Sequence, residues 1–156
     1  MGQQRWYERY AWVYFAVVAA VGLAGAVVVL VDPSSGDAMF ERFGFEAPAA
    51  IIGDAEAQRY VEHLFEWSAG MTVGVDLFTL LIAATAFRRG ERWAWLAFWY
   101  WPAAFLSHFL LYESDFRYAQ LVWMALAVAA LAVTARRAWS PGPAPEGSIA
   151  PAAAAR

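Results

Sequence analysis

Long runs of apolar residues alternate with short polar segments along most of the chain. Four runs are each long enough to cross a bilayer, which takes about 20 helical residues. They cover residues 10–31, 67–87, 93–112 and 118–135. A chain of 156 residues is too short to bury four such helices inside a water-soluble core. The pattern therefore predicts an integral membrane protein with four transmembrane helices.

The connections between the later runs are very short. Residues 88–92 join the second run to the third, and residues 113–117 join the third to the fourth. Connections of this length favour antiparallel neighbouring helices. We therefore expect an all-α fold, a four-helix transmembrane bundle with up-down-up-down topology that occupies residues 1–139. The Pro-rich, Gly-rich and Ala-rich residues 140–156 are expected to form a disordered cytoplasmic tail.

The segment 32–66 is the only long connection, and its pattern predicts short outer helices that cap the bundle. Asp37 is a candidate N-cap for a helix that runs through Phe43 and ends at Gly44. A second helical pattern begins at Asp54, and we expect it to continue without interruption into the run 67–87. Several apolar side chains occur in this segment, so it is expected to lie on the membrane or fold over the mouth of the bundle.

The arginines predict the orientation of the bundle. Eight arginines lie on one side of the four runs and three on the other. The eight are Arg5, Arg9, Arg88, Arg89, Arg92, Arg136, Arg137 and Arg156, and the three are Arg42, Arg59 and Arg117. By the positive-inside rule, both termini are expected in the cytoplasm of a multi-pass protein of the cell membrane, the inner membrane of a bacterium.

The composition excludes several classes of function. The chain is 62% hydrophobic and 16% charged, has no cysteine and carries a formal net charge of −3. Thiol catalysis, thiolate metal sites and disulfide scaffolds are excluded. A nucleic-acid partner is disfavoured because it usually requires a basic face. The expected partners are the lipid bilayer and another membrane protein or a second copy of the chain.

Asp76 is the first candidate functional residue. It lies about nine residues inside the second run, and no arginine or lysine occurs within any of the four runs. A carboxyl group at this depth is costly unless it is paired, hydrated or protonated, which makes it a candidate site by default. At matching depth we expect Tyr100 and Trp101, with the backbone around Gly22 on the first run. The carbonyl of Phe98, which loses its helical donor to a proline, is a possible hydrogen-bond partner. The alternative is a neutral carboxyl group that joins two helices by a hydrogen bond.

A second candidate is a group of polar residues near the outer end. His63 and Glu66 lie one turn apart, and His108 is expected in the same layer on the third run. Imidazole and carboxylate groups at one level are candidate ligands for a divalent metal such as zinc. The same groups could instead transfer protons. The alternative is a solvated acidic rim in which the histidines hydrogen-bond to glutamate.

A third candidate is the aromatic run Trp99, Tyr100 and Trp101, followed by Pro102. Large rings beside a proline kink can line a pocket for a flat apolar ligand. The alternative is a packed core, in which the rings fill the space beside the Gly70-x-x-x-Gly74 pair of the second run.

In these features the chain resembles two groups of membrane proteins. Around the turn Arg88-Arg89-Gly90-Glu91-Arg92-Trp93-Ala94-Trp95, over about residues 70–102, the chain resembles small four-helix bacterial membrane proteins of the DoxX-like type. More loosely, it is similar to the EXPERA-type bundles, the group of the sterol isomerase and the sigma-2 receptor. That resemblance implies a ligand pocket within the bilayer, with Glu66, Asp76 and His108 as its polar residues.

The sequence supports three functional hypotheses. The first is a non-enzymatic accessory subunit of a membrane assembly, favoured because motifs of soluble enzyme classes are missing. The second is an intramembrane pocket that binds or isomerises an apolar, lipid-like ligand, with Asp76 and Glu66 as the candidate acid and base. The third is a metal or proton site at the outer mouth.

Overall fold

The structure, a computed structural model, describes residues 6–140, and these residues form helices and connecting turns without strands. The elements are α1 (Trp6–Val31), α2 (Ser35–Phe43), α3 (Pro48–Ile51), α4 (Ala55–Ile82), the π-helix η1 (Ala83–Phe87), α5 (Arg92–Ala97), α6 (Tyr100–Leu111) and α7 (Phe116–Trp139). The predicted tail 141–156 and the arginines Arg5 and Arg156 lie outside the described residues. The all-helical class is confirmed for the described part.

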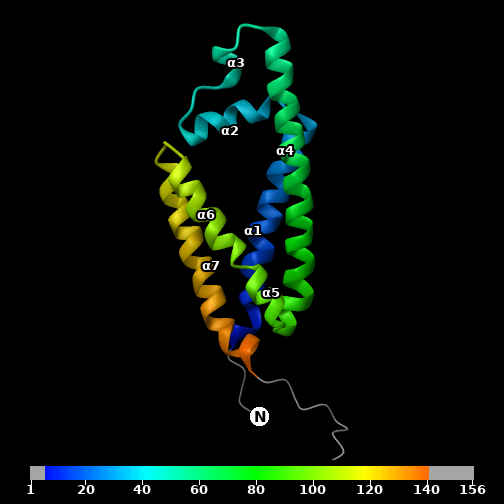
Figure 1. The fold of residues 1–156 in the computed structure, drawn as a ribbon, viewed down its shortest axis with the longest axis vertical. Helices are drawn as coiled ribbons and strands as arrows, with labels where there is room; N and C mark the ends of the chain where they lie inside the picture. The colour runs from blue at the N-terminus through cyan, green and yellow to red at the C-terminus, as the bar shows by residue number, and fades with distance from the viewer. Residues whose placement is uncertain (1–5, 141–156) are drawn as a thin grey trace, which may run out of the picture.

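The helices form two pairs that meet at one end. Helix α1 packs along α4, and α6 packs along α7 (Figure 1). Helix α1 also contacts α7, whereas α4 and α6 do not pack along each other within residues 6–140. The pairs converge near α5 and η1 and are bridged at the opposite end by α2 (Figure 1). Space therefore remains between the pairs beneath α2.

The outer part of α4 and the second apolar run form one continuous helix, as predicted. Asp54 precedes α4, and its carboxylate accepts hydrogen bonds from the backbone N–H groups of Glu56 (3.0 Å) and Ala57 (2.8 Å). The 28 residues of α4 extend over about 42 Å, more than the hydrocarbon core of a bilayer requires. The helix widens at its end into η1, a feature the sequence pattern did not predict.

The predicted third run is not one helix, which corrects the expectation of a continuous span over 93–112. It is divided into α5 and α6 by a turn at Phe98 and Trp99. The physical reason is Pro102, which has no N–H group for the Phe98 carbonyl. That carbonyl instead accepts from the Trp101 N–H at 3.2 Å, so it is not the free acceptor expected beside Asp76.

The capping of α2 also differs from the prediction. The helix begins at Ser35, and Asp37 lies in its first turn rather than at the N-cap. An acidic residue in the first turn still interacts favourably with the helix dipole. The predicted end is confirmed, because Gly44 adopts the left-handed conformation with φ of 98°.

Three phenylalanines form the centre of the packed end. The Phe15 ring lies 4.5 Å from the Phe98 ring and 5.2 Å from the Phe87 ring, and Phe87 and Phe98 are 4.8 Å apart (ring centroids). Small residues of η1, α5 and α7 surround them. This aromatic cluster, Phe15, Phe87 and Phe98, closes the space between the helix pairs at that end.

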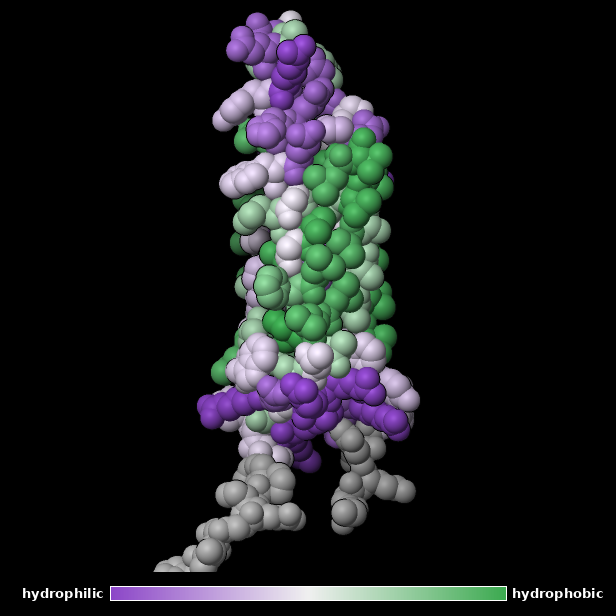
Figure 2. Space-filling model, turned by 90° about the vertical axis from the view of Figure 1, so that its right-hand side faces the viewer, coloured by the Kyte–Doolittle hydropathy of each residue, from purple (hydrophilic) through white to green (hydrophobic). Residues whose placement is uncertain are grey.

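Three helices are long and apolar enough to cross a membrane: Trp6–Val31, Ala55–Phe87 and Phe116–Trp139. The described ends of α1 and α7 lie beside the turn 88–92. The guanidinium carbon of Arg88 lies 5.5 Å from the ring centroid of Trp12, and that of Arg92 lies 3.5 Å from the ring centroid of Trp139. Arginines therefore gather at one end of the molecule. Figure 2 shows a wide hydrophobic band between this hydrophilic end and the polar outer end.

Candidate functional site

A cavity of about 440 Å³ lies beneath α2, between the two helix pairs. Most of its lining is apolar or aromatic, and its polar lining residues are Ser68, Thr72, His108 and Tyr112. The apolar and glycine lining is contributed by Gly22, Gly25, Ala26 and Val29 of α1, by Gly36, Met39, Phe40 and Phe43 of α2, and by Phe65 and Ala69 of α4. We call it the outer cavity. Its size and mixed lining are typical of a small-molecule site.

Helix α2 forms the roof of the outer cavity and is fastened to the α6–α7 turn. The Phe43 carbonyl accepts from the N–H groups of Glu113 (3.0 Å) and Ser114 (3.1 Å), and the Ser114 hydroxyl donates to the Arg42 carbonyl at 2.6 Å. The Phe43 ring stacks on Tyr112 with centroids 4.1 Å apart. Of the two locations expected for this segment, the structure shows that it folds over the mouth of the helices.

Asp76 is buried beside Gly22, a residue of the cavity wall, but is not itself a lining residue of the outer cavity. Its exposed fraction is 2%, and its Oδ2 atom is buried without a hydrogen-bond partner in the described structure. A Cβ atom added at Gly22 would overlap this oxygen, so the carboxyl group lies directly against the α1 backbone. The expected proximity of Asp76 to Gly22 is confirmed. Gly22 and Thr72, one turn before Asp76 on α4, both line the cavity.

His108 lines the opposite wall of the outer cavity and is held in place from two sides. Its ring is stacked on Tyr112 with centroids 5.2 Å apart. The buried side chain of Gln120 on α7 lies beside the imidazole and interacts with it. Because Tyr112 also stacks on Phe43, His108 is connected to the roof of the cavity through two aromatic contacts.

The outer cavity does not lead through the molecule. The aromatic cluster lies between it and the arginine-rich end, and Phe15, Phe87 and Phe98 are each at most 5% exposed. The arrangement is therefore that of a closed pocket and not of a continuous polar pathway.

The aromatic run after α5 lies elsewhere. Tyr100 and Trp101 line a second, more open groove of about 470 Å³ between α4 and α5–α6, whereas Trp99 packs edge-on against Trp95 with centroids 5.8 Å apart. Gly70 and Gly74 lie along this groove, and a Cβ atom added at either would meet nothing within 4 Å. The helices therefore do not pack closely at these glycines. We call this feature the α4–α5 groove.

The polar residues expected at one outer level are not brought together. His63 and Glu66 pair with each other at 3.4 Å and are exposed, with 75% and 45% of their side-chain surface accessible. Neither residue lines the outer cavity, whereas His108 does. Among residues 6–140 no group of three His, Asp or Glu side chains is placed to hold a metal ion.

Sequence reasoning did not single out the remaining polar residues of the site. Ser68, Thr72, Asp76 and Thr79 recur at helical spacing along α4, and this periodicity was the signal available for the first two. No local pattern marks Tyr112 or Phe43 as part of a site. Their stacking depends on contacts between segments that are about 70 residues apart in the sequence.

The comparisons with known proteins give no family for this chain. No family model matches the sequence, and no match is found among curated proteins or solved structures.

Proposed function

We propose that this protein is an integral membrane protein that binds an apolar, lipid-like ligand in the outer cavity. The observation that carries the proposal is the outer cavity itself, which is largely apolar but has Ser68, Thr72, His108 and Tyr112 in its lining. The apolar lining can hold the chain of a ligand, and these polar side chains can hydrogen-bond to a hydroxyl group on it. The ligand expected is therefore a long apolar molecule with a hydroxyl group.

The membrane arrangement is part of this proposal. Segment 92–111 runs from the arginine-rich end, where Arg92 contacts Trp139, to the roof, where Tyr112 contacts Phe43. We propose that α5 and α6 together form the fourth span of an up-down-up-down bundle. The arginine-rich end then faces the cytoplasm. Thiol labelling of a cysteine placed at Ser140 or Gly53 in intact cells tests this orientation, which fails if position 140 is labelled from outside.

Of the polar residues implied by the EXPERA-type resemblance, His108 lines the proposed pocket, whereas Asp76 is buried behind its wall. Glu66 does not support a catalytic pair with Asp76, because it pairs with His63 outside the lining of the cavity. The proposal is therefore binding, and the isomerisation suggested by the EXPERA-type resemblance is not part of it.

The binding proposal is tested with a fluorescent long-chain alcohol and a matched hydrocarbon probe that lacks the hydroxyl group. The wild-type chain in detergent is expected to prefer the alcohol. His108→Leu should abolish that preference while the helices remain folded, and Ser68→Phe should exclude both probes by filling the cavity. Thr134→Val on α7, buried but outside the lining of the outer cavity and of the second groove, is the control. Equal preference for the alcohol in wild type and His108→Leu would refute the proposal.

The hypothesis of a non-enzymatic accessory subunit stays a prediction. Its test is co-purification of a chromosomally tagged copy in mild detergent. Recovery of a lone monomer under every condition would contradict it.

A further inference from the structure

The α4–α5 groove is an apolar hollow that the chain itself does not fill. On α4 it is lined by Gly70, Met71, Gly74, Val75, Phe78, Thr79 and Ile82, and on the other side by Ala97, Phe98, Tyr100 and Trp101. It exists for two reasons. The glycines have no side chains, and the interruption before Pro102 divides the opposite segment into two short helices.

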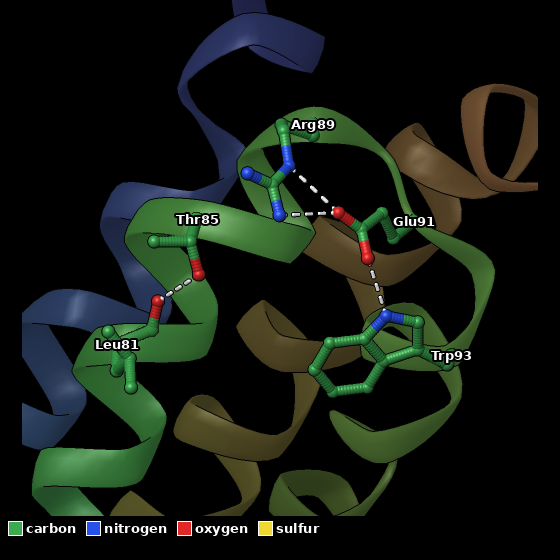
Figure 3. A network of polar contacts seen from close by, with 5 residues as sticks. All are labelled: Leu81, Thr85, Arg89, Glu91 and Trp93. Carbon is green, nitrogen blue, oxygen red and sulfur yellow. Dashed lines mark hydrogen bonds and ion pairs between the residues drawn. The ribbon is translucent and has the colours of Figure 1, made fainter.

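The groove continues towards a polar network at the arginine-rich end. Thr85 follows Ile82 by three residues, and Trp93 precedes the groove residue Ala97 by four, so each lies on the corresponding helix face. Figure 3 shows Thr85 close to the chain of contacts formed by Arg89, Glu91 and Trp93. These contacts lie about 10 Å beyond Ile82 along the helix axis.

Arg89 is held in a fixed position by this network. The Glu91 carboxylate accepts from Arg89 Nε at 2.8 Å and from the Trp93 indole at 2.5 Å (Figure 3). A second guanidinium nitrogen of Arg89 lies 2.6 Å from the same carboxylate oxygen. A guanidinium has five N–H donors, so Arg89 retains donors for another anion.

The charge of the turn favours an anionic group. Residues 88–92 contain three arginines and one glutamate. Within residues 6–140, Arg88 and Arg92 form no ion pair with a carboxylate and instead stack on Trp12 and Trp139. A guanidinium fork matches the geometry of phosphate as well as of carboxylate oxygens.

We propose that the α4–α5 groove is a binding site for one anionic glycerophospholipid of the leaflet at the arginine-rich end. One acyl chain lies in the groove along Gly70 and Gly74, and the phosphate meets Arg89 and the positive turn. Towards the arginine-rich end, the apolar groove comes first and the positive turn follows. A phospholipid of that leaflet has its acyl chain and its headgroup in the same order. The inference rests on the membrane location proposed above, but not on a ligand in the outer cavity.

Native mass spectrometry of the full chain in detergent tests this site. The protein is titrated with phosphatidylglycerol or with phosphatidylcholine of identical acyl chains. Wild type should bind phosphatidylglycerol at least about fivefold more tightly, as expected for one arginine near an anionic headgroup. Arg89→Gln should make the two Kd values equal. Gly74→Leu should weaken both lipids, because a side chain there fills the groove.

Two matched variants control for general effects. Arg136→Gln removes an exposed arginine at the same end of the molecule, and Ala129→Leu places a leucine at an exposed position of α7. Both should bind like wild type. The site is refuted if wild type binds both lipids equally, or if Arg136→Gln reduces selectivity as much as Arg89→Gln. A chain that stays soluble in plain buffer without detergent would instead refute the membrane location.

Discussion

The carboxyl group of Asp76 on α4 lies directly against the backbone of Gly22 on α1. The contact joins the only carboxylate of the second apolar run to a glycine, at a level where any side chain on α1 would push the two helices apart. The close approach of α1 and α4 and the burial of Asp76 therefore depend on each other.

Gly22→Ala is expected to lower the free energy of unfolding by about 1–3 kcal/mol, because the added methyl overlaps Asp76 Oδ2. Gly25→Ala is the matched control, since a Cβ atom there meets nothing within 4 Å. The control should be neutral or stabilising by up to about 1 kcal/mol, from helix propensity. Denaturation in mixed micelles followed by circular dichroism measures both.

The contact is isolated by a double-mutant cycle. In the background of Asp76→Ala, where the carboxyl group is absent, the cost of Gly22→Ala should largely disappear. An unchanged cost in that background would show that the methyl group meets something other than Asp76.

Phe43→Ala is expected to loosen the roof of the outer cavity. Loss of the ring stack on Tyr112 removes about 0.5–1.5 kcal/mol of aromatic pairing, so the open population should rise about two- to tenfold. Because the chain has no cysteine, Ala69→Cys gives a single reporter at a buried position of the cavity lining. Its rate of reaction with a water-soluble thiol reagent measures the opening.

Phe45→Ala is the control for the roof, because this exposed ring lies outside the cavity lining. It should leave the labelling rate of Ala69→Cys unchanged. Equal labelling rates of the reporter cysteine with and without Phe43→Ala would show that the stack does not hold α2 over the cavity.

Glu91 is expected to make stability depend on pH. Hydrogen bonds from Trp93 and Arg89 hold the pKa of Glu91 below its usual value. A lowered pKa means that the folded state favours the charged form. Its stabilising contribution is therefore complete above the ordinary glutamate value of about 4.3, and is lost as the pH falls through the lower folded value.

Thermal unfolding in detergent checks this dependence. Glu91→Gln should lower the midpoint at pH 7, and the difference from wild type should shrink towards zero near pH 3. Glu46→Gln, at an exposed position, should show no such difference at either pH. A difference for Glu91→Gln that persists at low pH would mean that the side chain acts through packing rather than charge.

Local rules were sufficient for much of the fold. Length and apolarity located the helices of the first, second and fourth runs, and Asp54 and Gly44 marked helix boundaries that the structure confirms. The level of Asp76 opposite Gly22 followed from counting residues into each run. These features depend on backbone hydrogen bonds within a segment and on its preference for an apolar environment, both of which are encoded over a few turns of helix.

The composition of the candidate site was decided by tertiary structure. Sequence spacing placed His63, Glu66 and His108 at one level, but it could not show that Glu66 turns outward to His63 while His108 lines the cavity. Pro102 indicated a kink, and only the packed structure shows two separate helices with a groove beside them. The contact of Phe43 with Tyr112 likewise joins distant segments. Such choices depend on which side chains fill the space between helices, and no local pattern contains that information.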